Sequence, residues 1–120
     1  MSLRDTLRSI VENVDGGLAA MIMAYDGISV DEVCIDQNEV DMQLLSVEYA
    51  TVLKEIRRSV EVIKAGDMEE VSITTNKTCV AIRVLNDELF VVLIIKRDGN
   101  FGKGRYLLRL KCGEIAQELT

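Results

Sequence analysis

The chain has 120 residues, of which 20 are acidic and 14 are basic, so its formal net charge is −6. This length is typical of a single domain, and an apolar content of 48% excludes a disordered chain. No apolar run approaches the roughly 18 residues that a membrane helix needs, and the N-terminal residues lack a signal-peptide core. We therefore expect one cytoplasmic domain over residues 1–120 without membrane insertion, and the acidic balance predicts no nucleic-acid partner.

The cysteines form no recognisable framework. Cys34, Cys79 and Cys112 are odd in number and far apart, and no C-x-x-C pair occurs. This spacing fits neither a disulfide scaffold nor a zinc site. The chain also has no histidine, which removes histidine-based nucleophile and metal sites. We expect three reduced thiols, no metal and no cofactor.

A first helix is predicted over residues 3–14, where the apolar positions form one stripe. Ser2 and Asp5 stand three residues apart before this stripe, in the manner of a capping box. Gly16 and Gly17 follow at the place where glycine commonly ends a helix.

A hairpin is predicted after the first helix. Leu18–Tyr25 is almost wholly apolar, as expected of a strand that is covered on both faces. Asp26-Gly27 is a strong signal for a two-residue turn. The next strand, Ile28–Ile35, reverses its alternation near Asp31–Glu32, which predicts a β-bulge and suits an edge strand.

A long second helix is predicted from about Asp41 to Ala65, with Gly66 at the position of a helix-ending glycine. One apolar stripe of this helix steps by three and four residues and is expected to face the sheet. It consists of Met42, Leu45, Tyr49, Val52, Ile56, Val60 and Ile63.

Three strands and a last helix are predicted in the second half of the chain. The strands are expected at 68–75, 79–84 and 89–95, and the helix from about Arg105 to Leu119. The whole order is α-β-β-α-β-β-β-α, an α+β fold whose short hairpins make the sheet mostly antiparallel. Strands that are apolar on both faces belong in the middle of the sheet, and the half-polar segments Ile28–Ile35 and Met68–Thr75 belong at its edges.

Three stretches carry a resemblance to a known family. They are Gly16–Ile28, the long helix from Asp41, and Phe90–Ile95 followed by Asn100–Arg105 and a helix rich in arginine and leucine. Over essentially its whole length the chain resembles the Roadblock (dynein light chain roadblock) family. Within that family it is most similar to the short bacterial MglB-type regulators of Ras-like GTPases.

The resemblance implies a profilin-like Roadblock fold with strand order 2-1-5-4-3, helices 1 and 3 on one face of the sheet and helix 2 on the other. It also implies a homodimer formed by pairing of third strands and packing of second helices. The implied function is a non-catalytic regulator or scaffold of a Ras-like small GTPase, in a process such as cell polarity or motility. The sequence leaves open whether it activates hydrolysis, promotes exchange or only anchors the GTPase.

Catalytic and nucleotide sites have weak support in the sequence. The Gly99–Gly104 segment lies between a strand and a helix but lacks the P-loop order, so we interpret it as a flexible connection. The adjacent carboxylates Asp31-Glu32 and Asp87-Glu88 are interpreted as solvated charges rather than as acid–base pairs. The basic stretch from Lys96 to Lys111 is interpreted as a solvated loop and helix face, and we expect no enzyme activity.

The second helix carries the expected contact surfaces. A second, weaker apolar stripe has an opposite-charge pair at its middle, a layout that suits an antiparallel twin helix. With two residues of the third strand it forms the expected dimer interface: Leu44, Val47, Thr51, Glu55, Arg58, Val62, Val71 and Ile73. We expect Ile73→Pro to dissociate this dimer. The outward pole of the helix is expected to bind the GTPase through Ala50, Lys54, Arg57 and Glu61.

A small-molecule sensor domain is the alternative hypothesis, because a sheet flanked by helices can enclose a ligand. Such a domain needs a large pocket with a few convergent polar groups. Only Arg83 and the tyrosines are candidates for that role, and aromatic residues make up 4% of the chain. The regulator hypothesis is therefore preferred.

Overall fold

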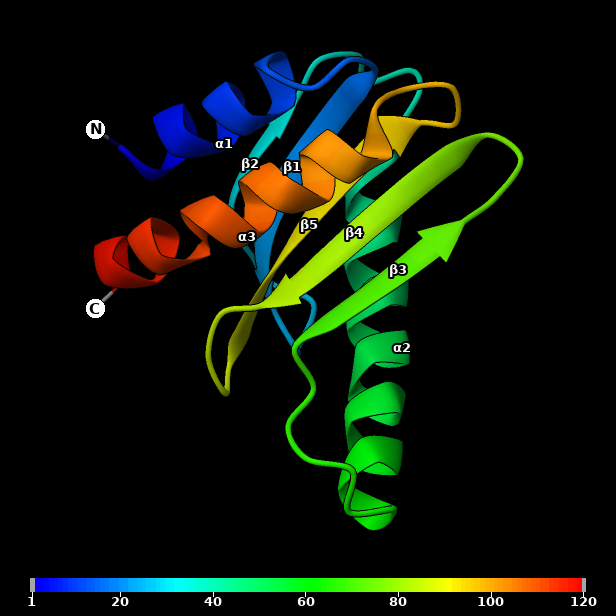
Figure 1. Ribbon diagram of the computed structural model, residues 1–120, viewed down its shortest axis with the longest axis vertical. Coiled ribbons are helices and arrows are strands. Elements are labelled where there is room, and N and C mark those ends of the chain that lie inside the picture. Colours follow the sequence, from blue (N-terminus) through cyan, green and yellow to red (C-terminus); the bar gives the residue numbers. More distant parts are fainter. Residues whose placement is uncertain (1, 120) are drawn as a thin grey trace.

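The computed structural model describes residues 2–119, which form one five-stranded antiparallel sheet between two layers of helices (Figure 1). The elements are α1 (Leu3–Glu12), β1 (Gly17–Ala24), β2 (Ser29–Cys34), α2 (Met42–Val62), β3 (Glu70–Thr74), β4 (Thr78–Val84), β5 (Leu89–Lys96) and α3 (Phe101–Glu118). The sheet order is β2-β1-β5-β4-β3. The α+β class, the element order and the sheet order predicted above are confirmed.

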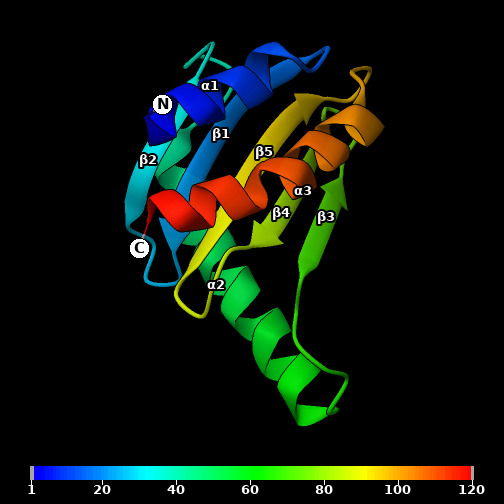
Figure 2. The same cartoon turned by 60° about the vertical axis from the view of Figure 1, so that its left-hand side comes forward.

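The central strands divide the core into two layers. β1 and β5 pair along their length, and nearly all of their residues are buried. Alternate side chains point to opposite faces of the sheet. Ile22 and Leu93 pack in the layer that also holds residues of α1 and α3, whereas Met21 and Phe90 pack in the layer under α2. The two views in Figures 1 and 2 show these helices on opposite sides of the sheet.

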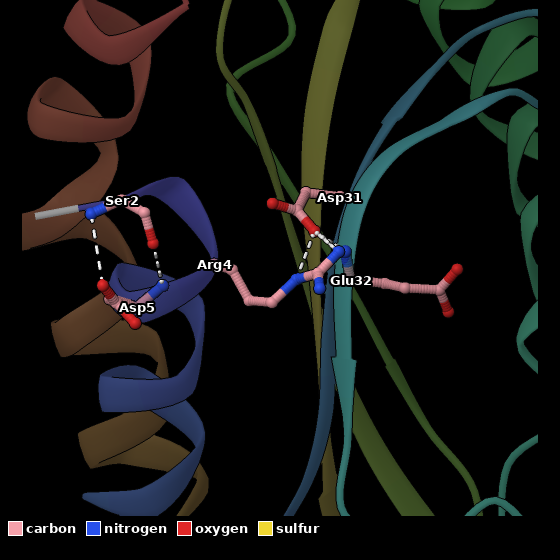
Figure 3. A network of polar contacts seen from close by, with 5 residues as sticks. All are labelled: Ser2, Arg4, Asp5, Asp31 and Glu32. Atoms are coloured by element: carbon pink, nitrogen blue, oxygen red, sulfur yellow. Dashed lines mark hydrogen bonds and ion pairs between the residues drawn. The ribbon is translucent and has the colours of Figure 1, made fainter.

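α1 begins with the predicted capping box and is fastened to β2 (Figure 3). The N–H of Asp5 donates to Ser2 Oγ at 3.1 Å, and the N–H of Ser2 donates to the Asp5 carboxylate at 3.3 Å. These hydrogen bonds lower the pKa of Asp5. Arg4 reaches across to β2, where its Nε donates to Asp31 Oδ1 at 2.9 Å. The predicted bulge is confirmed beside this contact, with Val30 as the extra residue.

α2 ends earlier than predicted, and the residue that follows its C-cap is a lysine. Its C-cap is Ile63, and Lys64 adopts the left-handed conformation with φ 55°. The N–H of Lys64 donates to the carbonyl of Glu61, and the N–H of Ala65 donates to the carbonyl of Val60, each at 3.1 Å. This is the Schellman arrangement, so the helix-ending role predicted for Gly66 is wrong.

α3 begins earlier than predicted, at Phe101 instead of about Arg105. The reason is Asn100, whose side chain accepts a hydrogen bond from the N–H of Lys103 at 3.1 Å and caps the helix. Gly104 is buried in the first turns, and a Cβ there would lie 2.4 Å from Cδ1 of Ile95. The interpretation of Phe101–Gly104 as a flexible connection is therefore wrong, because these residues bring α3 close to β5.

No helix of the described residues is long and apolar enough to cross a bilayer. All three cysteines carry free thiols: Cys79 is buried, and Cys34 and Cys112 are half-buried. Burial raises the pKa of the Cys34 and Cys112 thiols, which lowers the thiolate fraction that reacts with alkylating agents.

We expect iodoacetamide at pH 8 to label the native protein slowly at all three cysteines. After unfolding without reductant, mass spectrometry should count three labels per chain, because no disulfide joins Cys34, Cys79 and Cys112. A count of one label after unfolding would reveal a disulfide and contradict both the structure and the expectation of reduced thiols.

Candidate interaction surface on α2 and β3

β3 is an edge strand with one open side. It pairs with β4, and no strand among residues 2–119 lies beyond it. The carbonyl of Glu69 accepts from Val84, and the N–H of Thr75 donates to Thr78, so alternation directs the backbone groups of Val71 and Ile73 toward β4. The groups of residues 70, 72 and 74 therefore point to the open edge. An edge of this kind is a template for pairing with another strand.

The side chains of β3 also differ between the two faces. Val71 and Ile73 are half-buried and pack against the layer under α2. Ser72 and Thr74 are exposed and point to the other face. The open edge of β3 therefore has an apolar margin on the α2 side, as the predicted dimer interface requires.

α2 approaches the sheet through small residues as well as large ones. Its buried residues are Ser46, Ala50 and Leu53. The predicted sheet-facing stripe is only partly correct, because Val52 is 41% and Ile63 is 71% exposed. The second half of α2 projects past the end of the sheet (Figures 1 and 2), which leaves its apolar residues uncovered.

The stripe that was expected to face a twin helix forms the outer crest of α2. This crest consists of Leu44, Val47, Thr51, Glu55, Arg58 and Val62, all of them exposed. At 100° per residue these positions lie opposite the buried Leu53 and Ser46, so the crest points away from the sheet. A salt bridge of 3.4 Å joins Arg58 to Glu55 at its middle.

The two flanks of α2 face different parts of the sheet. Leu45, Glu48 and Tyr49 line a hollow together with Thr78 and Val80, so this flank faces β4 and the β3 edge beyond it. Helical spacing continues it through three further exposed residues. We name the set Glu48, Val52, Ser59 and Ile63 the β3-side flank. The opposite flank lies near the β1–β2 turn, where a Cβ at Gly27 would lie 3.9 Å from the Val47 Cα.

That opposite flank holds the predicted partner-binding residues, and two of them are misplaced. Ala50 is only 2% exposed, so its assignment to an outward pole is wrong. Arg57 is half-buried, with its guanidinium 4.0 Å from the centroid of the Tyr25 ring and its Nη1 donating to the carbonyl of Asp87 at 2.8 Å. Arg57 thus fastens α2 to the β4–β5 turn. Lys54 and Glu61 are exposed, as predicted.

A hollow of about 510 Å³ opens beside Arg57, between the second half of α2 and the β4–β5 turn. Glu61, Asp67 and Asp87 are among its lining residues. Burial raises the pKa of Tyr25, and the nearby charge of Arg57 opposes that rise. The Tyr25 hydroxyl has no hydrogen-bond partner among the described residues.

Arg83, the other polar group considered for a sensor, does not share this hollow. It pairs with Glu70 at 3.8 Å, and Arg105 of α3 pairs with the same carboxylate. The structure therefore does not bring Arg83 and the tyrosines together in one pocket. Among residues 2–119, no group of three or more histidine, cysteine, aspartate or glutamate side chains could hold a metal ion.

Comparison with known proteins adds the following. No protein-family model and no curated protein sequence matches the chain. Among solved structures, MglC from Myxococcus xanthus is 41% identical, with a TM-score of 0.71 over 98% of this chain and 99% of that one. A Roadblock/LC7 domain from Streptomyces avermitilis has a TM-score of 0.86 at 12% identity over 99% and 98% of the two chains. The gliding protein MglB from Thermus thermophilus has a TM-score of 0.82 at 10% identity over 98% and 91%.

Proposed function

Because the chain belongs to the Roadblock/LC7 family, we propose that it is a non-catalytic, homodimeric regulator or scaffold of a Ras-like small GTPase. One observation carries the proposal: α2 and the β3 edge offer apolar and backbone groups that the chain itself leaves uncovered. One structurally similar protein is a gliding protein, which supports a role in cell motility.

The homodimer in this proposal joins two β3 edges into one continuous sheet. The β3-side flank of α2 then meets its counterpart, because it faces the β3 edge of its own chain. Val52 and Ile63 lie there in exposed positions, and Val71 and Ile73 give the β3 edge its apolar margin. This flank supplies the helix contacts that the sequence analysis had assigned to the crest.

The GTPase in this proposal docks on the crests of the two α2 helices. In a dimer paired through β3, both crests point away from the continuous sheet and form one platform. Leu44, Val47 and Val62 are each more than half exposed there, and Lys54 and Glu61 add charge at the side. A mixed apolar and charged surface of this kind suits a transient partner.

The first test measures binding and GTP turnover with a Ras-like GTPase encoded beside this chain. We expect the two proteins to co-elute in size-exclusion chromatography at tens of micromolar. Phosphate release and nucleotide exchange, each measured with and without this protein, then separate activation of hydrolysis, promotion of exchange and anchoring. Absence of a complex with both the GDP-bound and the GTP-bound GTPase would refute the proposed function.

A further inference from the structure

Basic side chains that form no salt bridge with the described residues cluster at one end of the molecule. Lys77 lies on the β3–β4 turn, Lys96 and Arg97 lie at the end of β5, and Lys103 lies in the first turn of α3. All four are exposed, and the salt bridges of residues 2–119 involve none of them. We name these four residues the basic end. It stands out because the whole chain has a formal net charge of −6.

The backbone holds these cations in one place. Lys96 pairs in register with Thr78, and the N–H of Arg97 donates to the carbonyl of Lys77 at 3.0 Å. The β3–β4 turn and the β5–α3 connection therefore lie side by side (Figure 1). Close packing fixes the connection as well, since a Cβ at Gly99 would lie 2.3 Å from the carbonyl oxygen of Asp15.

An open hollow of about 620 Å³ lies between these segments. Lys77, Lys96 and Arg97 line it, together with Asn76 and the carboxylates Glu39 and Asp98. Its volume is in the range of sites that hold small ligands or a few residues of a peptide. Three cations among its lining residues therefore face two carboxylates.

The N-termini of two helices add partial positive charge at the basic end. α2 and α3, with 21 and 18 residues, both begin toward this end of the sheet, and helix N-termini carry partial positive charge. The hollow at the other end of the sheet is lined by Glu61, Asp67 and Asp87, with Arg57 as its cation. Cations thus outnumber carboxylates in the lining of the first hollow, and carboxylates outnumber cations in the lining of the second.

We propose that the basic end binds a short acidic segment of a partner protein. Two or three carboxylates spaced along such a segment can pair with Lys77, Lys96 and Arg97, which line one hollow. Arginine offers paired donors that match a carboxylate, and the lysines add charge without demanding one geometry. None of the residues that line this hollow belongs to the crest of α2, so a GTPase and an acidic segment have different contact residues.

Other anionic partners fit this surface less well. A nucleic acid carries one charge per about 1.7 Å of duplex and extends far beyond four cations, into the negative field of the chain. A planar anionic membrane is flat, whereas the cations line a hollow.

The test uses the full chain and a fluorescein-labelled decapeptide of alternating glutamate and serine, followed by fluorescence anisotropy at 50 mM salt. We expect saturable binding that weakens at 200 mM salt, and a loss of at least tenfold in affinity in Lys96→Glu/Arg97→Glu. The matched control is Arg8→Glu/Arg109→Glu, which changes the net charge equally at two exposed arginines outside the basic end. The control should keep most of the affinity, and both variants should keep the melting temperature.

Four results would overturn the proposal. They are no binding of the peptide by the unchanged protein, an equal loss in both variants, tighter binding of single-stranded DNA than of the peptide, and tighter binding of vesicles with 30% phosphatidylserine. Because no GTPase is present in these measurements, failure of the proposed function leaves them unaffected. The reverse also holds, since Lys96→Glu/Arg97→Glu should leave GTPase binding through the crest unchanged.

Discussion

Ser72→Pro should separate the homodimer while leaving the fold of each protomer intact. The N–H of Ser72 points to the open edge of β3, so proline removes a donor that only a second chain can use. Twofold symmetry applies the loss twice. At about 1 kcal/mol net for each hydrogen bond, with the added clash of the ring, the cost is roughly 2–3 kcal/mol. This corresponds to a weakening of the dimer by roughly 30- to 150-fold.

Sedimentation velocity at tens of micromolar measures this effect directly. The unchanged protein should sediment as a dimer and Ser72→Pro largely as a monomer, with nearly the same melting temperature after dilution to monomer. Ser72→Val is the matched control, because it keeps the N–H and suits a strand, and it should remain dimeric. A dimeric Ser72→Pro, or an unchanged protein that is monomeric at this concentration, would contradict pairing through β3.

Ile73→Pro, which the sequence analysis suggested for the same purpose, is a poorer choice. The backbone groups of Ile73 point toward β4 within the chain, so proline there breaks the protein's own ladder. We expect it to lower the melting temperature of the monomer, and loss of the dimer would then have two explanations. Strand alternation of side chains was visible in the sequence, but the direction of the backbone groups depends on the register with β4.

The architecture was predictable because local chemistry and long-range packing agree. The two strands with apolar residues on both faces, Leu18–Tyr25 and Phe90–Ile95, lie side by side at the middle of the sheet, each covered by helices on both faces. Turn signals such as Asp26-Gly27 fixed the hairpins. The errors lie at helix ends, where a single hydrogen bond decides the boundary. Asn100 caps α3 before two glycines that disfavour a helix by themselves.

The candidate site was harder to predict because the faces of α2 depend on how closely the helix approaches the sheet. A pattern of large apolar residues placed Val52 and Ile63 on the sheet, whereas two of the three buried residues of α2 are the small Ser46 and Ala50. Small residues at a close contact give a weak hydrophobic signal. Arg57 was predicted to be exposed because its contact with the Tyr25 ring exists only in the folded chain and leaves no pattern in the sequence.

Leu44→Glu/Val47→Glu should abolish most of the GTPase binding without unfolding the protein. Both side chains are more than half exposed on the crest, so the folded chain loses little when they change. A glutamate at position 44 also stands three residues after the cap Asp41, where an acidic group favours a helix. Burying two carboxylates in the GTPase contact instead leaves charges without partners, which costs roughly 2 kcal/mol or more.

The expected result is therefore a weakening of GTPase binding by roughly 30-fold or more, measured by biolayer interferometry with the GTP-bound partner. The matched control is Val30→Glu/Ile35→Glu, which replaces two apolar residues of similar exposure, 46% and 58%, at the other edge of the sheet. This control should bind normally and keep the same net charge as the crest variant. If the control loses the GTPase and the crest variant keeps it, the GTPase docks on the β2 edge and α2 serves the dimer alone.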